Sequence, residues 1–315
     1  MGRRIVIAGA SGFLGQYLSR RFRENGDSVA TIGRSASDAT WGDASAIESL
    51  LDGADILINL AGKSVNCRYT RRNKAVIFSS RLLTTAQLGD AVLAVANPPR
   101  FWFNASTATI YRHADDRAQT DETGELGSGF SVNVATAWER EFFAHHRDGV
   151  RQIALRIAIV LGDGSALAPL VALTRFGLGG PQFGGATRGA RQRFSWVHID
   201  DVFRAIEFLV EHPGLGDTVN VASPNPVENR ELMATLRRVL GRRIGIPLFA
   251  WMLEIGAFAI RTETELLLKS RWVVPSRLLA AGFVFEFPTL EGALRDILTP
   301  GSLRRDNNNP AIESR

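Results

Sequence analysis

Hydrophobic and polar positions follow two alternating rhythms in the first half of the chain. Short β-branched or apolar runs predict buried strands at Ile5–Ala8, Ser28–Ile32, Ile56–Leu60, Phe101–Ala105 and Ile153–Ile157. Longer stretches of helical periodicity cover Phe13–Arg23, about Lys74–Val95 and Phe130–Arg147. Strands that alternate with helices imply right-handed crossovers. The pattern therefore predicts an α/β fold with a doubly wound parallel sheet.

The rhythm changes after Gly162. Six glycines within Gly177–Gly189 predict a loop. A strand at Phe194–Val197, a helix at Asp201–Glu211 and a strand at Thr218–Val221 follow, and 229–298 is mostly helical. We expect a first domain over 1–165 that 190–222 rejoins, and a smaller, mostly helical C-terminal lobe built from 166–189 and 223–300. Residues 301–315 lack apolar periodicity, which predicts a disordered tail.

Composition and charge argue against several classes of function. The 37 basic and 32 acidic residues give a net charge of +5, but the arginines are scattered as singles and pairs, which argues against a nucleic-acid partner. Cys67 is the only cysteine and the five histidines are dispersed, so we expect neither a disulfide framework nor a metal site. No run reaches the ~20 apolar residues of a membrane span, and the N-terminus lacks a signal-peptide core. The prediction is a cytoplasmic protein without a membrane partner.

A glycine-rich turn links the first predicted strand to the first helix. Gly9 permits the tight turn, Gly12 lets the backbone approach a pyrophosphate, and Gly15 lets the helix pack on the strand. Free N–H groups at the helix N-terminus favour phosphate binding. The candidate phosphate-binding residues are Gly9, Ser11, Gly12, Phe13, Leu14 and Gly15.

The end of the second strand indicates which dinucleotide binds. An acidic residue there would hold the ribose hydroxyls of NAD, but this chain has Arg34 and Ser35, which can clamp a 2′-phosphate. The prediction is therefore NADP(H). Asp43 is a candidate acceptor for the adenine amino group, with a solvated aspartate as the alternative. Ile58–Gly62 ends the fourth strand of such a fold at its carboxyl edge, where Leu60 and Ala61 would line the cofactor and Gly62 would let the backbone pass close to it.

Several segments together resemble a known family. Gly9–Gly15 and Asn59–Gly62 are similar to the extended short-chain dehydrogenase/reductases. Five further segments resemble the atypical branch of this superfamily, the NAD-dependent epimerase/dehydratase-like "epimerase family protein" group. They are Ser80–Thr85, Leu155–Gly162, Gly177–Pro181, Ser195–Asp201 and Val274–Phe283. The resemblance spans about 3–298 and implies a Rossmann-like domain, a C-terminal substrate lobe and NADP(H). It also implies that Arg81 reaches the cofactor phosphate or ribose and that Ile159 lines the nicotinamide end.

The usual acid–base pair of that superfamily, Tyr-x-x-x-Lys, is missing. None of the three tyrosines has a lysine four residues later, and Ser131 and Ala135 fall on the two positions. The remaining candidates are Ser106 or Thr107, which could bind a substrate carbonyl, and Tyr111, which could replace the missing tyrosine. The alternative for the two hydroxyls is that they only satisfy nearby backbone.

His198 with Asp200 and Asp201 allows a catalytic His/Asp interpretation. We favour a structural one, in which one aspartate caps the following helix and His198 packs beneath the junction with the lobe.

The sequence as a whole predicts an NADP(H)-binding oxidoreductase or epimerase-like protein that acts on an unidentified small molecule. A non-catalytic NADP(H)-binding sensor or scaffold is the alternative, and a homo-oligomer is left open.

Overall fold

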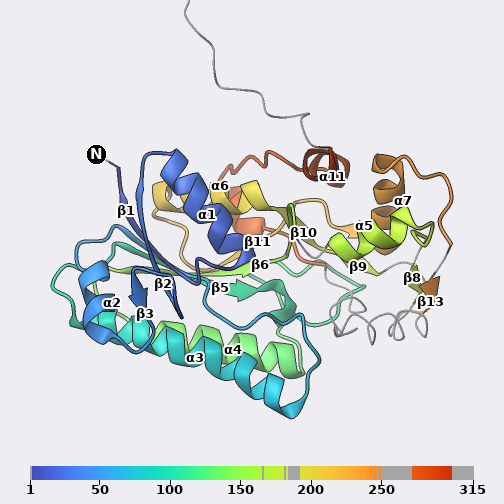
Figure 1. The fold of residues 1–315 in the computed structure, drawn as a ribbon. Coiled ribbons are helices and arrows are strands. Elements are labelled where there is room, and N and C mark those ends of the chain that lie inside the picture. The colour runs from blue at the N-terminus through green and yellow to red at the C-terminus, as the bar shows by residue number, and fades with distance from the viewer. Residues whose placement is uncertain are drawn as a thin grey trace, which may run out of the picture.

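The computed structural model describes residues 2–164, 167–180, 182–183, 192–246, 248–249 and 272–299. Its centre is a seven-stranded sheet in the order β11-β6-β5-β4-β1-β2-β3, and every strand pair is parallel (Figure 1). The strands are β1 (Arg4–Ala8), β2 (Ser28–Gly33), β3 (Ala39–Thr40), β4 (Ile56–Asn59), β5 (Phe101–Thr107), β6 (Arg151–Ile157) and β11 (Asp217–Val221). The strand order reverses between β1 and β4. In such sheets the crevice outside the carboxyl ends of these two strands is where ligands bind.

Two helical layers cover the sheet (Figure 1). On one face lie α1 (Phe13–Glu24) and α6 (Ile199–Glu211), and on the other lie α2 (Ala44–Leu51), α3 (Arg71–Ala94) and α4 (Phe130–Ala144). Ile5 and Ile7 pack into the core beneath α1 and α6, whereas Val6 and Ala8 pack toward α2, α3 and α4. Because both faces are buried, the central strands β1 and β4 are continuous apolar runs apart from one terminal residue each, instead of alternating with polar residues. The predicted α/β doubly wound fold is confirmed.

The C-terminal lobe begins where the chain leaves the carboxyl ends of β6 and β11 (Figure 1). Its elements are α5 (Ala168–Arg175), β8 (Gln182–Phe183), β12 (Val227–Glu228), α7 (Asn229–Val239), β13 (Leu248–Phe249), α10 (Ser276–Ala280) and α11 (Leu290–Leu298). Three short strands connect them to the rest of the chain: β7 (Ile159–Leu161), β9 (Arg193–Phe194) and β10 (Trp196–His198). A separate apolar cluster, which includes Trp196, Leu232, Met233 and Leu294, forms its core. The predicted tail, 301–315, and most of the second half of the predicted glycine-rich loop lie outside the described residues.

The single strand predicted at Phe194–Val197 is wrong. Ser195 separates two strands that have different partners: β9 is antiparallel to β12, and β10 is parallel to β7. The Ser195 side chain accepts from the Val273 N–H at 2.8 Å, so it binds a third segment at this break. The division follows from pairing with segments distant in the sequence, which the local apolar run does not encode.

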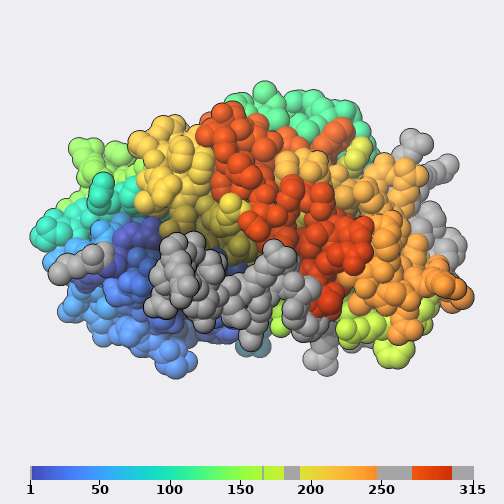
Figure 2. Space-filling model, turned by 90° about the horizontal axis from the view of Figure 1, so that it is seen from above, coloured from blue at the N-terminus to red at the C-terminus, as the bar shows by residue number. Residues whose placement is uncertain are grey.

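Residues 272–277 tie the lobe to the first half of the chain. Gln119 N–H donates to the Trp272 carbonyl at 2.7 Å, and Val274 N–H donates back to the Gln119 carbonyl at 3.1 Å. The Asp121 carboxylate accepts from Ser276 Oγ at 2.8 Å, and burial raises the pKa of this carboxyl. Figure 2 shows residues 272–299, in red, lying between α6 in yellow and α7 in orange. The two parts of the protein are therefore joined through directional hydrogen bonds as well as apolar packing.

Candidate nucleotide-binding site

The glycine-rich turn forms one wall of the crevice between β1 and β4. Gly9 has φ of +82°, and a Cβ there would lie 2.8 Å from the backbone of Leu60 and Ala61. A Cβ on Gly15 would lie 2.5 Å from the Gly9 carbonyl oxygen. At Gly12, by contrast, the nearest atom to such a Cβ would be the Gly9 oxygen at 3.4 Å. Gly9 and Gly15 are thus required by the fold itself, whereas the space in front of Gly12 is open to a ligand.

This difference makes a prediction about two substitutions. Gly9→Ala forces a side chain into backbone at positive φ, so we expect a loss of stability of about 1 kcal/mol or more. Gly12→Ala meets only ordinary contacts, so we expect a near-normal free energy of unfolding and weakened dinucleotide binding, because its methyl group occupies the phosphate path. Urea unfolding and calorimetric titration with NADPH measure the two effects. A strongly destabilised Gly12→Ala variant would contradict this division of roles.

Helix α1 presents its N-terminus to the same crevice. Gly12 is the N-cap residue, no side chain caps the helix, and its first turn holds no acidic residue. Ser11, Gly12 and Phe13 are exposed there and Leu14 is half-buried. The uncapped N–H groups and the positive end of the helix dipole favour an anion at this position.

The end of β2 carries the residues predicted to select the cofactor. Arg34 and Ser35 are both exposed beyond β2. The nearest acid along the chain, Asp38, accepts from the Thr31 N–H and hydroxyl at 2.7 and 2.8 Å, and the Thr31 hydroxyl holds the pKa of this carboxyl below its ordinary value. Asp43 is the N-cap of α2, where its Oδ1 accepts from Ala46 N–H at 3.0 Å. Its predicted adenine contact therefore depends on the other carboxylate oxygen.

A buried polar network positions the end of β4 opposite the glycine-rich turn. Asn59 Nδ2 donates to Thr85 Oγ1 on α3 at 2.9 Å and to Asn104 Oδ1 on β5 at 2.7 Å. Asn59 Oδ1 accepts from Ala61 N–H at 3.0 Å, and Trp138 Nε1 of α4 donates to Thr85 at 2.9 Å. Leu60, Ala61 and Gly62 follow directly. Side chains from β4, α3, β5 and α4 therefore fix the backbone path of these three residues. A side chain on Gly9, on the opposite wall, would not fit beside Leu60 and Ala61.

Arg81 of α3 lies behind Gly62. Its guanidinium carbon would be 3.0 Å from a Cβ on Gly62, and it lies 5.1 Å from the centroid of Trp138. Arg81 Nη1 donates to the carbonyls of Lys63 and Ile77 at 3.1 and 3.0 Å, and burial lowers its pKa. Within the described part of the chain no carboxylate forms an ion pair with Arg81. A positive charge without a protein counter-ion, next to this crevice, favours an anionic ligand.

The candidate catalytic residues meet in a second buried network. Ser106 Oγ donates to Glu139 Oε1 at 2.6 Å. Arg156 binds Glu139 through two hydrogen bonds of 2.9 and 2.8 Å, and its Nη1 donates to the Tyr111 hydroxyl at 3.0 Å. Tyr111 in turn donates to Asn220 Oδ1 at 2.8 Å. The network links α4 to β5, β6 and β11, and it joins Ser106 to Tyr111 through an ion pair.

These contacts occupy the hydroxyls of Ser106 and Tyr111, two of the three candidates. Tyr111 is 2% exposed, burial raises its pKa, and its hydroxyl both donates and accepts within the protein. Ser106 is 6% exposed and holds Glu139. Thr107 is half-buried and caps the short helix η1 (Ala108–Ile110) by accepting from Thr109 N–H at 3.2 Å, which is the alternative backbone role expected from the sequence. In this arrangement Tyr111 is better suited to hold Arg156 than to exchange a proton with a substrate.

Helix α4 explains why the usual pair is absent. Ala135, at the lysine position, is 1% exposed and packs in an apolar cluster with Tyr111 and Val132. A lysine there would bury its ammonium among apolar side chains. Ser131, at the tyrosine position, lies on the same helix, and its buried hydroxyl has no hydrogen-bond partner among the residues that the structure describes. Neither side chain supplies the missing acid or base.

Sequence reasoning missed Glu139, Arg156 and Asn220. A signal was present, since Arg156 is the one charged residue in the otherwise apolar run Ile153–Ile157, which predicts a buried partner. Ile159, expected at the nicotinamide end, is half-buried in β7, the first strand after β6. Its position beyond the carboxyl end of β6 is compatible with that role.

His198 and its aspartates are structural, but the predicted cap is wrong. His198 itself is the N-cap of α6, and its Nδ1 accepts from Asp200 N–H at 3.2 Å. Asp201 is fully buried and accepts from the N–H groups of Glu286 and Phe287 at 2.7 and 3.0 Å, tying α6 to the C-terminal segment. The His198 ring contacts Phe287, with centroids 3.8 Å apart, so it lies at the junction with the lobe.

His198 makes the stability of this junction depend on pH. Burial lowers the pKa of His198 below its ordinary 6.5, although Asp296, Asp200 and Glu286 oppose the shift. As the pH falls below 6.5, His198 therefore binds a proton more readily in the unfolded chain than in the folded chain. The contribution of neutral His198 to the free energy of unfolding is present above this pH and is lost as the pH falls. We expect wild type to lose more stability between about pH 7.5 and about pH 5.5 than His198→Asn, which keeps a capping side chain. Urea unfolding at both pH values gives the comparison, and equal losses would contradict it.

Two absences hold for the described residues. None of their helices combines the length and apolarity that a bilayer span requires. No group of histidine, cysteine and carboxylate side chains among them is arranged to hold a metal ion.

The fold and the glycine-lined crevice define a Rossmann-like protein. The model of the NAD dependent epimerase/dehydratase family matches residues 5–222, and the chain belongs to this family. A domain of unknown function matches residues 248–297.

The human "Epimerase family protein SDR39U1" is 31% identical over 302 residues, covering 94% of this chain and 99% of its own. "Epimerase family protein YfhF" of Bacillus subtilis is 28% identical over 303 residues, covering 93% and 97%. The crystal structure of human SDR39U1 (isoform2) "with NADPH" matches with a TM-score of 0.82 and 28% identity, covering 93% of this chain and 98% of that one.

Proposed function

We propose that this protein binds NADP(H) in the crevice between β1 and β4 and acts as an oxidoreductase or epimerase-like protein on a small molecule. The observation that carries the proposal is the combination of an open, uncapped glycine turn with Arg34 and Ser35 at the end of β2. The similar human structure was crystallised with NADPH, which supports the same cofactor. Arg81 adds a positive charge beside Gly62, where a phosphate or ribose would lie.

The cofactor supplies the hydride, and the chain's residues orient it. The helix α1 N-terminus binds the pyrophosphate, Arg34 and Ser35 bind the 2′-phosphate, and Leu60, Ala61 and Ile159 line the path toward the nicotinamide. The C-terminal lobe provides the substrate side of the site, and 190–222 belongs with the nucleotide-binding domain. The cytoplasmic location, the oligomeric state and the roles of Ser106 and Thr107 at a substrate carbonyl stay predictions.

Turnover tests the enzymatic part. A positioned acid or base contributes ~10²–10⁴-fold, so without Tyr-x-x-x-Lys we expect NADPH oxidation on simple carbonyl compounds to be slower than in ordinary family reductases. Ser131→Ala should retain wild-type activity, whereas Ser106→Ala should lower it, because Ser106 lies at the carboxyl end of β5. The measurement is NADPH oxidation across a carbonyl panel, with unfolding curves to exclude loss of structure. Fast turnover that disappears in Ser131→Ala would contradict this assignment.

A sensor or scaffold is the second candidate. The closed hydrogen bonding of Tyr111 and the burial of Ala135 favour it, because neither leaves a proton donor above the nicotinamide. Tight NADPH binding without turnover on any substrate is the outcome that distinguishes it from an enzyme.

A further inference from the structure

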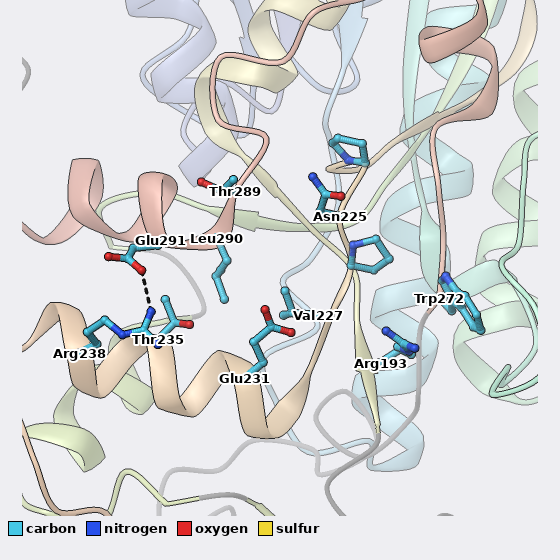
Figure 3. A pocket seen from close by; sticks show the side chains of 12 residues that line it. Arg193, Asn225, Val227, Glu231, Thr235, Arg238, Trp272, Thr289, Leu290 and Glu291 are labelled. Carbon is cyan, nitrogen blue, oxygen red and sulfur yellow. Dashed lines mark hydrogen bonds and ion pairs between the residues drawn. The ribbon is translucent and has the colours of Figure 1, made fainter.

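The C-terminal lobe contains a pocket of about 570 Å³ that shares no residue with the proposed cofactor site. It lies between α7 and α11, beyond the carboxyl end of β11, and we call it the α7–α11 pocket (Figure 3). Its volume is within the ~300–1,000 Å³ range of small-molecule sites. Apolar walls come from Pro224, Pro226, Val227, Leu290 and the ring of Trp272. A ligand in this pocket would therefore present an apolar part to these walls, beside the polar side chains that also line it.

The charged groups at its edges are mostly paired with one another. Arg238 binds Glu291 at 2.6 Å, and Glu291 also binds Arg295 at 2.7 Å (Figure 3). The Arg193 guanidinium lies over Trp272, 4.7 Å from the ring centroid. Arg238 and Glu291 therefore close one side of the pocket without offering an open charge.

Glu231 is different. It projects from the first turn of α7 into the pocket, is exposed, and forms no ion pair within the part of the chain that the structure describes (Figure 3). One helical turn further on, Thr235 also lines the pocket. Thr235 is 5% exposed, and its hydroxyl makes no hydrogen bond to the described residues. A carboxylate without an ion pair and a hydroxyl without a hydrogen bond among the described residues thus lie on one face of the helix.

We propose that the α7–α11 pocket binds a small molecule that carries a protonated amine on an apolar body, with Glu231 as the counter-ion and Thr235 as a second acceptor. An ammonium group has several N–H donors and no acceptor, which matches a carboxylate and a hydroxyl oxygen. A carboxylate or phosphate ligand would meet the negative charge of Glu231 instead. The site stands independently of hydride transfer, since none of its lining residues belongs to the proposed cofactor site.

The competing explanation is that Glu231 only stabilises the N-terminus of α7 by its charge. That role predicts a change in stability when Glu231 is neutralised, but no preference among ligands. The experiment therefore measures both binding and unfolding for each variant.

Matched probes of opposite charge test the proposal on the full-length protein, with and without NADPH. Tryptamine and phenethylamine are compared with 3-indolepropionate and 3-phenylpropionate by calorimetry and saturation-transfer NMR. We expect the amines to bind and the acids not to bind, and Glu231→Gln to weaken amine binding by about 10-fold or more. Thr235→Val should weaken it by a smaller factor, whereas Glu211→Gln, which neutralises an exposed glutamate on α6, should leave it unchanged.

Three results would overturn the proposal: neither amine binds, the acids bind as tightly as the amines, or Glu231→Gln binds amines as wild type does. Loss of NADPH affinity in Arg34→Ala with amine binding intact would separate this site from the cofactor site. Amine binding by a wild-type protein that fails to bind NADPH would refute the proposed function and leave this proposal standing.

Discussion

Replacing Arg156 by Met is expected to lower the free energy of unfolding by about 3–5 kcal/mol, the range for removing one partner of a buried ion pair. The Arg156 and Glu139 side chains are only 12% and 10% exposed. Without Arg156, Glu139 keeps the hydrogen bond from Ser106 but loses its buried counter-ion. Tyr111 loses one of its two hydroxyl partners as well. Urea unfolding followed by circular dichroism measures the loss.

Two further variants show whether the buried charge is the cause. Arg156→Met combined with Glu139→Gln removes both charges, and we expect this double variant to be more stable than Arg156→Met alone. Arg20→Met, on the exposed face of α1, removes a surface pair with Glu24 and a cation–π contact with Tyr17, and should cost less than about 1 kcal/mol. A double variant that is less stable than the single one would show that volume or hydrogen bonding, and not charge, dominates at this position.

Replacing Arg34 by Ala is expected to weaken NADPH binding by about 1.5–3 kcal/mol, roughly 10–150-fold, because a hydrogen-bonded charge pair with the 2′-phosphate is lost. NADH lacks this phosphate, so its affinity should stay nearly constant. Arg34 is exposed and no described residue holds its side chain, so the fold should tolerate the change. Calorimetric titration of both dinucleotides into both proteins provides the measurement.

The control for this experiment is Arg20→Ala, which removes the same charge from a helix face away from the β2 end and should leave both affinities unchanged. Equal affinity of the wild type for NADPH and NADH would refute the role of Arg34. A parallel loss of NADH affinity in Arg34→Ala would instead indicate a change in the shape of the β2–β3 loop.

Local sequence was sufficient for most of the fold. The apolar runs at Ile5–Ala8 and Ile56–Leu60 correspond to β1 and β4, and the glycine spacing marks the turn between β1 and α1. These features depend on residues close together in the chain: strand propensity, helical periodicity and the need for positive φ at Gly9. The two-residue strand β3 was not predicted, because two residues are too few for a periodic signal.

The absence of a Tyr-x-x-x-Lys pair was also determined by the sequence, since none of the three tyrosines is followed by a lysine at that spacing. The sequence did not determine how the remaining polar side chains are connected in that part of the structure. The Ser106–Glu139–Arg156–Tyr111 network joins residues separated by 17 to 45 positions along the chain, and the Asp201 contacts span 85 and 86. Sequence reasoning expected Asp200 or Asp201 to cap the helix that follows, but the folded chain brings the Glu286 and Phe287 N–H groups to the Asp201 carboxylate.

The α7–α11 pocket likewise depends on the tertiary structure and not on the local sequence. Glu231 and Thr235 are an ordinary pair on an amphipathic helix in the sequence, and only the packing of α7 against α11 makes them part of the lining of a pocket. Local propensities fix which residues form helices and strands, because backbone conformation depends on near neighbours. Which polar groups become buried, paired or left unpaired is decided when distant segments exclude water from one another, and that occurs only in the tertiary structure.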